Sequence, residues 1–319
     1  MEFLLDGIRA VTPQQCVMYV VGALLIYLAI KKDYEPSLLL PMGFGAILVN
    51  LPMSGVLNQM VAGVGESQGI IQWLFETTIE ASEALPLLLF IGIGAMIDFG
   101  PLLSNPKMFL FGAAAQFGIF FAMIAAVLLG FDLKDAASIG IIGAADGPTT
   151  IFVAQKFAAE LLAPLTVTAF CYMSLVPIIQ PPIIRLLTTK RERRIRMAYK
   201  EEKPVSWMAR FLFPFMVVFF AGILAPISVP LIGALMFGNM LKVSGVVDSL
   251  ASTAQNELAN LVTLFLGITV GATMTAENIL TFDVLKILIL GAAAFVFDTV
   301  GGVMCAKFMN LSLIHISEP

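Results

Sequence analysis

The stretch SIGIIGAADGPTTIF, residues 138–152, decides the fold, because it places a carboxylate, a glycine and a proline inside a long apolar region. Glycine lowers helix propensity, and Pro148 removes a backbone donor and disfavours the helical conformation at Gly147. Non-helical backbone at membrane depth is tolerated only where it is buried in protein or lines a cavity. Asp146 is an ionisable residue at such a break, so the stretch predicts two half-helices that meet at an ion site.

The composition identifies the class of protein around this break. Of 319 residues, 59% are hydrophobic and 13% are charged, whereas ordinary soluble domains are about 25% charged. Several apolar stretches approach the roughly 20 residues that span a bilayer. We therefore predict an all-α polytopic membrane protein with an inverted-repeat, transporter-like fold, broken helices and about nine or ten membrane segments.

Several function classes are disfavoured by what the chain lacks. No basic region precedes the first apolar run, so a signal peptide is not expected. The three cysteines stand singly, the one histidine is His315, and no phosphate-binding GxxxxGK[ST] motif occurs. Zinc, disulfide, histidine-based and ATP-dependent chemistry are thus not indicated, and nothing points to nucleic acid.

The chain divides into two membrane halves around a basic loop. The first half is residues 1–184, with the broken helix at 140–152, and the second is residues 207–310. The segments expected in order are 14–30, a short span or re-entrant piece at 37–52, a loop at 53–70, an amphipathic stretch at 70–83, spans at 85–99 and 108–129, the broken stretch at 136–157, a proline-interrupted span at 161–187, a span at 207–225, a second broken segment at 226–241, and apolar stretches at 261–271 and 280–309.

The loop at 185–206 gives the orientation. Eight of the 18 basic residues of the chain lie between positions 185 and 203. By the positive-inside rule this loop is cytoplasmic. The loop either only orients the chain or also docks a cytoplasmic partner, and the sequence leaves both interpretations open.

Three carboxylates lie near membrane depth. Asp98 precedes Gly100-Pro101 and is interpreted mainly as a helix cap at the interface. Asp298 lies deeper, and either a polar partner on another helix or a function would explain it. Asp146 is both a candidate N-cap of the half-helix that starts near Pro148 and a candidate ion ligand, and the two roles are compatible.

The residues around Asp146 favour a hard cation. Thr149 and Thr150 supply hydroxyls, and a break exposes carbonyl oxygens, with Gly143, Gly147 and Pro148 as supporting residues. Tyr172 follows the break by about 25 residues; if its helix folds back, the hydroxyl can donate to Asp146 or carry a proton. Gln180 is a weaker candidate of the same kind. Oxygen ligands of this type suit Na⁺.

Eight short motifs carry a resemblance that covers residues 15–310. They are YLAIKK at 27–32, YEP at 34–36, FIGIGAM at 90–96, DFGPLL at 98–103, GIIGAADGPT at 140–149, YM at 172–173, VPIIQPP at 176–182 and LTTK at 187–190. The chain resembles the β subunit of the sodium-pumping, biotin-dependent decarboxylases, which act on oxaloacetate, methylmalonyl-CoA, glutaconyl-CoA or malonate.

The resemblance implies a function and partners. A carboxyltransferase α subunit would move CO₂ from substrate to biotin on a carrier protein, and a small membrane γ-type subunit would complete the complex. The β subunit would decarboxylate carboxybiotin, with no bound cofactor of its own, and couple CO₂ release to Na⁺ export and proton uptake. Asp146 and Tyr172 match family residues implicated in the cation site and the proton path. The implied location is the cell membrane of a prokaryote, and a homo-oligomer is compatible with it.

The end of the chain departs from the family pattern. Members of the family carry a second broken element after the span that matches 280–309. Its sequence resembles Gly-Ala-Ala-Gly followed by Ser-Ala-Val-Pro. Here the chain ends LSLIHISEP at 311–319, a string that one reading frame of a common sequencing adapter encodes. We expect residues 311–319 to be adapter-derived, the second half to be incomplete, and a chain so truncated to be inactive.

Two alternatives belong to other classes. A gradient-driven Na⁺- or H⁺-coupled secondary transporter without chemistry would share the broken helices. The family motifs, above all the QPP at 180–182 and the basic loop after it, argue against it. A purely structural scaffold is disfavoured by Asp146 at a break.

Overall fold

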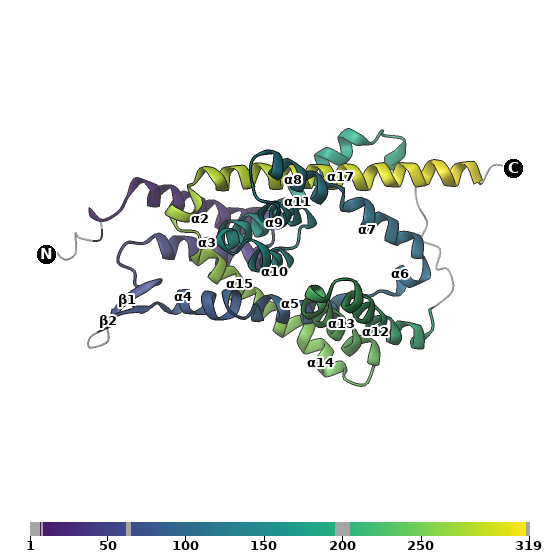
Figure 1. The fold of residues 1–319 in the computed structure, drawn as a ribbon, viewed down its shortest axis with the longest axis horizontal. Coiled ribbons are helices and arrows are strands. Elements are labelled where there is room, and N and C mark those ends of the chain that lie inside the picture. Colours follow the sequence, from purple (N-terminus) through teal and green to yellow (C-terminus); the bar gives the residue numbers. More distant parts are fainter. Residues whose placement is uncertain (1–6, 8, 62–64, 195–204, 317–319) are drawn as a thin grey trace.

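Helices dominate the computed structural model, which describes residues 7, 9–61, 65–194 and 205–316. The first part of the chain forms α2 (Pro13–Lys32), α3 (Pro36–Asn50), strands β1 (Asn58–Val61) and β2 (Gly65–Gln68), α4 (Ile70–Phe75), the π-helical turn η1 (Glu76–Glu80), α5 (Ala84–Met96), α6 (Gly100–Ser104), the 3₁₀ turn η2 (Pro106–Met108), α7 (Phe109–Ala115), α8 (Phe117–Leu128), α9 (Leu133–Gly140), the 3₁₀ turn η3 (Ile141–Ala144) and α10 (Gly147–Phe157) (Figure 1).

The remaining elements follow in the same order along the chain. They are η4 (Ala159–Leu161), α11 (Leu162–Leu187), η5 (Glu192–Arg194), α12 (Trp207–Leu224), η6 (Pro226–Ser228), α13 (Val229–Ser244), α14 (Asp248–Thr253), the π-helical turn η7 (Ala254–Leu258), α15 (Ala259–Ala272), α16 (Ala276–Ile279) and α17 (Phe282–Ile316).

Membrane-length helices confirm the predicted class. Within the described ranges, six helices are long and apolar enough to cross a membrane. A seventh span results if Ile70–Glu80 and Ala84–Met96, which meet at a 65° bend, are taken together. The helix Pro36–Asn50 is apolar but shorter. The protein is therefore an all-α polytopic membrane protein.

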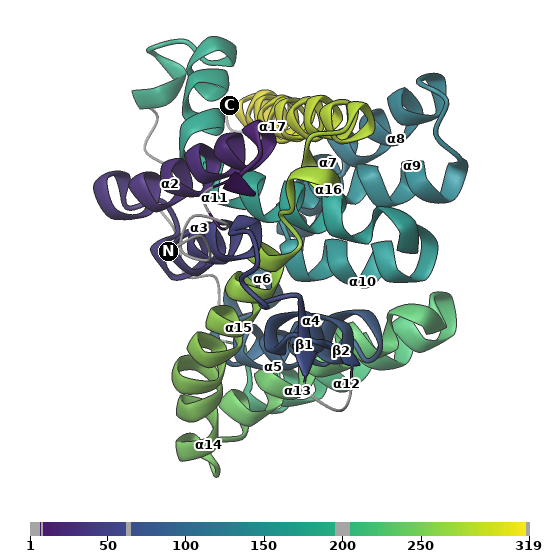
Figure 2. The ribbon, with the colours of Figure 1, turned by 90° about the vertical axis from the view of Figure 1, so that its left-hand side faces the viewer.

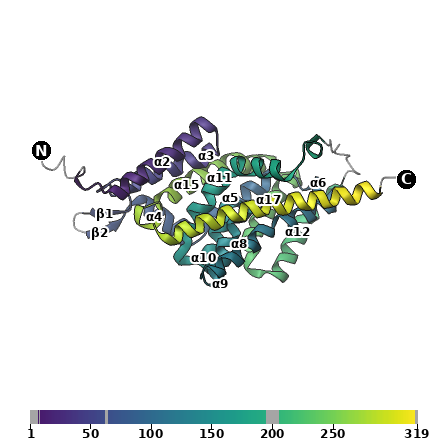
Figure 3. The same ribbon diagram turned by 90° about the horizontal axis from the view of Figure 1, so that it is seen from above.

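The helices form two groups, seen end-on in Figure 2. In one group α17 packs along α7, α8 and α11, with the hairpin of α9 and α10 beside them. In the other, α5 packs on α13 and α15, and α3 packs on α2 and α15. Each group takes helices from both sides of the basic loop, because α17 joins the first group and α5 the second. Figure 3 shows α17 running along most of the length of the molecule.

Close helix contacts hold the second group together. A side chain on Gly94 of α5 would collide with the carbonyl of Leu235, and one on Gly238 of α13 would collide with the carbonyl of Ile91. Small residues at this crossing let the two backbones approach, which strengthens packing where lipid gives no hydrophobic driving force. The buried Asn239 amide adds hydrogen bonds to the carbonyls of Gly94 and Ile97.

Three local expectations are wrong. Residues 53–70 contain the antiparallel β1–β2 hairpin rather than only loop. The α11 helix runs unbroken through its three interior prolines, because neighbouring helices in a membrane protein can satisfy the freed backbone groups. Residues 226–241 are not broken either: Pro230 lies in the first turn of α13, where no amide hydrogen is needed, and the helix continues to Ser244.

Candidate functional site

The predicted break is a tight turn between α9 and α10. Helix α9 passes into the 3₁₀ turn η3, and Ala145 adopts the left-handed conformation with φ of 57°. Asp146 is then extended, and α10 begins at Gly147. We call residues 133–157 the re-entrant hairpin and residues 143–146 its tip. The break is therefore confirmed, with the reversal placed at Ala145.

The hairpin enters and leaves on the same side of the bundle. Before α9, the Phe131 ring lies 5.5 Å from the Nζ of Lys286, near the start of α17. Glu160, just after α10, lines the same cavity as Asp283 of α17. The tip residue Gly143 instead faces Asp298, 12 residues further along α17 than Lys286, or roughly 18 Å at helical rise. Figure 2 shows α9 and α10 side by side, so this segment returns rather than crossing.

Asp146 caps α10 with help from two threonines. Its carboxylate accepts from the Thr149 backbone amide at 3.3 Å and from the Thr149 hydroxyl at 2.6 Å. The Thr150 hydroxyl donates to the Asp146 carbonyl at 2.9 Å. The N-cap interpretation is confirmed, and Asp146, Thr149 and Thr150 form one oxygen-rich cluster at the tip.

Gly147 and Pro148 fix the path of the chain beside this cluster. A Cβ atom on Gly147 would lie 2.7 Å from the ring of Phe170 on α11, so a larger residue there would push the hairpin away. Pro148 occupies the first turn of α10, where its missing amide hydrogen costs nothing. Both residues are buried and support the tip from the side of α11.

Tyr172 points to α17 rather than to Asp146. Its hydroxyl donates to the Leu288 carbonyl at 2.5 Å, and its ring lies 5.4 Å from that of Phe295. The expected hydroxyl contact with the Asp146 carboxylate is therefore wrong. Phe170 is the α11 residue that faces the hairpin, and two residues further along a helix the side chain is turned by about 200°.

A cavity of about 350 Å³ lies on the other side of the tip. Its polar lining comes from Gln116, Gln180, Asp298 and Thr299, and the tip residues Gly143–Ala145 close one wall. Gln180 and Gly143 were predicted to support the site, and both lie here. Gln116 was missed, although its position as the one strongly polar side chain within the apolar run 108–129 is a usable signal.

Asp298 is a second carboxylate of this region and is half-buried. Its Oδ1 accepts from the backbone amide of Gly118 at 2.6 Å, and its Oδ2 is buried without a hydrogen-bond partner. The sequence offered a polar partner on another helix as one explanation of Asp298, and the Gly118 amide of α8 is such a partner. That contact accounts for only one of the two oxygens.

Asp98 lies apart from this cluster. Its carboxylate accepts from the Gly100 amide at 2.9 Å and pairs with Arg210 at 2.8 Å. The pKa of Asp98 lies below its usual value, mainly because of the hydrogen bond from Gly100. Burial is the next largest effect and opposes the decrease, and the charge of Arg210 adds to it. Asp98 lies at a helix end, as predicted, but the N-cap of α6 is Phe99, and Asp98 is the residue before it.

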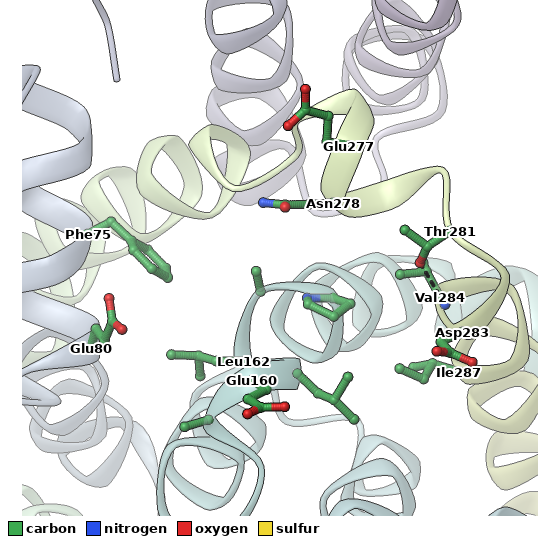
Figure 4. A pocket seen from close by; sticks show the side chains of 14 residues that line it. Phe75, Glu80, Glu160, Leu162, Glu277, Asn278, Thr281, Asp283, Val284 and Ile287 are labelled. Atoms are coloured by element: carbon green, nitrogen blue, oxygen red, sulfur yellow. Dashed lines mark hydrogen bonds between the residues drawn. The ribbon is translucent and has the colours of Figure 1, made fainter. Parts of the chain in front are cut away.

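A larger cavity of about 450 Å³ does not form a metal site. Figure 4 shows Glu80, Glu160, Glu277 and Asp283 on different sides of it. Asp283 is paired with Lys286 at 2.8 Å. Within the described part of the chain, no three acidic, histidine or cysteine side chains come close enough to share a metal ion.

A bundle of apolar helices with a re-entrant hairpin and half-buried carboxylates beside its tip defines a helical membrane transport protein. A model of the family described as the Na⁺-transporting oxaloacetate decarboxylase beta subunit matches residues 14–319. The chain therefore belongs to this family of decarboxylase β subunits.

Individual relatives agree with the family. The chain is 45% identical over 306 residues to the methylmalonyl-CoA decarboxylase subunit beta of Veillonella parvula, covering 96% of this chain and 78% of the relative. It is 46% identical over 305 residues to the glutaconyl-CoA decarboxylase subunit beta of Acidaminococcus fermentans, with the same coverage. The oxaloacetate decarboxylase beta chain of Haemophilus ducreyi is 40% identical over an alignment of 367 residues, covering 98% and 84%.

Proposed function

We propose that this chain decarboxylates carboxybiotin on a partner carrier protein and couples the release of CO₂ to Na⁺ export and proton uptake. In that step the bond between the biotin ring nitrogen and the carboxyl carbon breaks, CO₂ leaves, and the nitrogen takes up one proton. Membership of a family of Na⁺-transporting decarboxylase β subunits supports the proposal. The observation that carries it is the placement of Asp146 at the tip of a re-entrant hairpin.

The cluster at the tip fits Na⁺ as a transported ion. Asp146 provides negative charge, Thr149 and Thr150 provide hydroxyl oxygens, and the reversal at Ala145 interrupts the helical ladder so that carbonyl oxygens of the tip become available. Hard cations prefer such oxygen ligands. We assign Asp146, Thr149 and Thr150 as Na⁺ ligands.

Tyr172 is proposed as a group on the proton path. Its hydroxyl lies between α11 and α17, hydrogen-bonded to the Leu288 carbonyl. A phenol can donate and accept at once, so it can pass a proton along a chain of partners. This role replaces direct ligation of Na⁺ by Tyr172, since its hydroxyl is bonded away from the carboxylate.

The proposed complex contains a carboxyltransferase α subunit, a biotin carrier protein and a small membrane γ-type subunit. The names of the relatives, all subunits beta or beta chains, support a multi-subunit assembly. We place the protein in a prokaryotic cell membrane with residues 185–203 in the cytoplasm, where the basic side chains would meet acidic groups of a partner. Residues 195–203 lie outside the described ranges, so this docking rests on sequence alone.

Substitution of Asp146 by asparagine tests the proposal. Asparagine is also a good N-cap, so Asp146→Asn removes the charge while α10 keeps its cap. When the change is made in a full-length subunit, we expect loss of Na⁺-dependent CO₂ release from carboxybiotin on the carrier, with assembly of the complex unchanged. Asp248→Asn, at an exposed carboxylate of α14, is the matched control. Unchanged Na⁺ dependence in Asp146→Asn would remove Asp146 from the ion site.

A secondary transporter without chemistry is the competing function. It would use the same hairpin and carboxylates, but Na⁺ flux would not depend on carboxybiotin. Na⁺ movement into proteoliposomes, measured with and without the carboxylated carrier, separates the two functions. Flux that is independent of the carrier would favour the transporter.

A further inference from the structure

Helices α12 and α13 pack on each other and leave an apolar groove between them (Figure 1). The groove has a volume of about 390 Å³, and all of its lining side chains are apolar. The lining includes Pro214, Phe215 and Phe219 of α12 and Gly233, Met236 and Met240 of α13. Because the rings of Phe215 and Phe219 are more than half exposed, the groove opens to the outside of the bundle. We call it the α12–α13 groove.

One end of the groove lies where α12 begins. The indole Nε1 of Trp207, the first residue of α12, donates to the carbonyl of Val243 on α13 at 3.0 Å, which joins the two helices at this end. Trp207 directly follows the basic loop that we place in the cytoplasm, and tryptophan is enriched at the membrane–water interface. This mouth of the groove therefore lies at the level of the lipid headgroups on the cytoplasmic side.

Two cationic side chains lie at the mouth. Arg210 precedes Pro214 of the groove by four residues, so both lie on the same face of α12. Lys242 follows Met240 of the groove by two residues and is exposed. The Nζ of Lys242 donates to the Met96 carbonyl at the end of α5 at 2.7 Å. None of the ion pairs among the described residues includes Lys242.

Asp98 neutralises only one of these two cations. Its Oδ1 accepts from Nη2 of Arg210 at 2.8 Å, so the group of Asp98, Arg210 and Lys242 keeps one net positive charge. A guanidinium has five N–H donors and an ammonium has three. Each of the two side chains uses one donor on a described residue. The remaining donors are available to the oxygens of an anion, where charge-assisted hydrogen bonds are strong.

The size of the groove favours a hydrocarbon chain over a helix as its occupant. One turn of an α-helix with its side chains is about 10 Å wide and 5.4 Å long and fills roughly 400 Å³. The groove would therefore hold no more than one turn. A single acyl chain is much narrower than a helix and can follow the groove along its length.

We propose that the α12–α13 groove binds one anionic phospholipid, with its phosphate at Lys242 and Arg210 and one acyl chain in the groove. Such a lipid matches both parts of the site, because its negative phosphate lies at the interface and its chain runs from there toward the membrane centre. Basic pockets between membrane helices on the cytoplasmic side bind headgroups of this kind. The inference is independent of the transported ion and of carboxybiotin.

Trp207 is a natural reporter at the mouth of the groove. The chain has two tryptophans, so Trp73→Phe leaves Trp207 as the only one. This variant is reconstituted in phosphatidylcholine vesicles that contain increasing fractions of a brominated lipid, whose bromine atoms quench a tryptophan in contact with them. We expect half-maximal quenching at a several-fold lower fraction of brominated phosphatidylglycerol than of brominated phosphatidylcholine. Equal fractions for the two lipids would overturn the inference.

A charge variant in the same background tests the phosphate contact. Lys242→Gln removes one positive charge and keeps an N–H donor for the Met96 carbonyl. It should raise the half-maximal fraction of phosphatidylglycerol about fivefold, the effect of one basic residue near anionic headgroups, and Lys242→Arg should restore it. Lys107→Gln, at another exposed lysine without an ion pair to a described residue, is the matched control and should change nothing. An unchanged fraction in Lys242→Gln contradicts the proposal.

Gly233→Leu separates a defined site from a general attraction of anionic lipids to basic side chains. A Cβ atom at Gly233 meets nothing within 4 Å, so leucine can occupy the groove without moving a helix, and leucine is the better helix former. The preference for phosphatidylglycerol should be lost although Lys242 and Arg210 remain. Gly112→Leu on α7, where a Cβ atom is equally free, should keep it. A preference that persists in Gly233→Leu would show that the groove is not the site.

A protein occupant of the groove gives a different result. A helix of a partner or of a second copy would keep both brominated lipids away from Trp207. Weak quenching by both lipids would therefore overturn the inference, and the particle mass from light scattering would then show whether a second copy covers the groove.

Discussion

Asp298 and Gly143 are in direct contact, with room for hydrogen but not for a methyl group between the carboxylate of one and the backbone of the other. The contact joins the middle of α17 to the tip of the re-entrant hairpin. Asp298 also holds the start of α8 through Gly118. The helices α17 and α8 and the hairpin therefore meet at one carboxylate. A change in the position of that carboxylate should displace the hairpin.

Gly143→Ala should displace the tip. The added Cβ would lie 2.6 Å from Asp298 Oδ2 and 3.0 Å from the Cβ of Ala294, so either the hairpin or α17 must shift. Overpacking of this kind costs about 1–3 kcal/mol. We expect a lower thermal midpoint and weaker ²²Na⁺ binding than in the unmodified chain.

The control for this change is Gly112→Ala in α7. A Cβ at Gly112 meets nothing within 4 Å, and alanine is the better helix former. Its midpoint should stay the same or rise. Equal behaviour of the two alanine variants would show that the contact between Gly143 and Asp298 is not tight.

Tyr172→Phe should separate proton movement from Na⁺ binding. The substitution leaves the Leu288 carbonyl without the hydroxyl donor, which costs roughly 1 kcal/mol for a hydrogen bond between membrane helices. Proton uptake, followed with a pH-sensitive dye in proteoliposomes, should fall. Binding of ²²Na⁺ should persist, because the hydroxyl does not bond to Asp146.

The exposed Tyr27 provides the comparison, since Tyr27→Phe removes a hydroxyl from the surface of α2 and should change neither measurement. Loss of Na⁺ binding in Tyr172→Phe would show that the Tyr172 hydroxyl is a ligand of the ion.

The ion pair between Glu83 and Lys156 should stabilise the docking of the hairpin on the second helix group. Their charged atoms are 2.7 Å apart, and Glu83 is only 5% exposed. Glu83→Gln, Lys156→Met and the double variant form a double-mutant cycle, read from thermal or denaturant unfolding. We expect a coupling energy of about 0.5–3 kcal/mol, the range for residues in contact.

Lys156→Met alone should be the most destabilising of the three variants, because it leaves the Glu83 carboxylate buried and unpaired. Additive effects of the two single changes would show that the pair does not fix the end of α10 to α5.

Asp98 should make stability depend on pH. Its pKa is lowered in the folded chain by the Gly100 amide and by Arg210. The stabilisation is therefore present above the pKa of the unfolded chain and is lost as the pH falls through the folded-state value. The side chain is 53% exposed, so the effect is small, about 0–1 kcal/mol.

Thermal unfolding between about pH 7 and pH 3 measures this pH-dependent contribution of Asp98 to stability. Asp98→Asn should flatten the dependence, since it keeps an oxygen for the Gly100 amide but cannot be charged. The same slope in both proteins would assign the acid sensitivity to other carboxylates.

Local chemistry made much of the architecture predictable. A carboxylate followed by glycine and proline cannot continue an α-helix easily, so the break at Asp146 and its N-cap could be derived from residues 146–148. The apolar content predicted the membrane class, and the position of Asp98 before Gly100-Pro101 predicted a helix end, which the structure has at the start of α6. These features depend on neighbours within a few residues, which a sequence displays directly.

Other expectations were wrong because distant helices overrode local signals. Interior prolines predicted an interruption in α11, yet the helix is continuous. A break was also predicted at 226–241, but α13 is continuous there, and Gly238 allows close packing on α5. The return of the hairpin to its own side depends on packing against α11 and α17, which residues 133–157 do not encode by themselves.

The sequence by itself determined that this protein is a helical membrane protein with a broken helix at Asp146, because hydrophobicity and backbone propensity act over short distances. Only the tertiary structure decided that Tyr172 faces α17 and that Asp298 reaches both Gly118 and Gly143. Those contacts join residues more than 100 positions apart, and their geometry follows from how the helices pack.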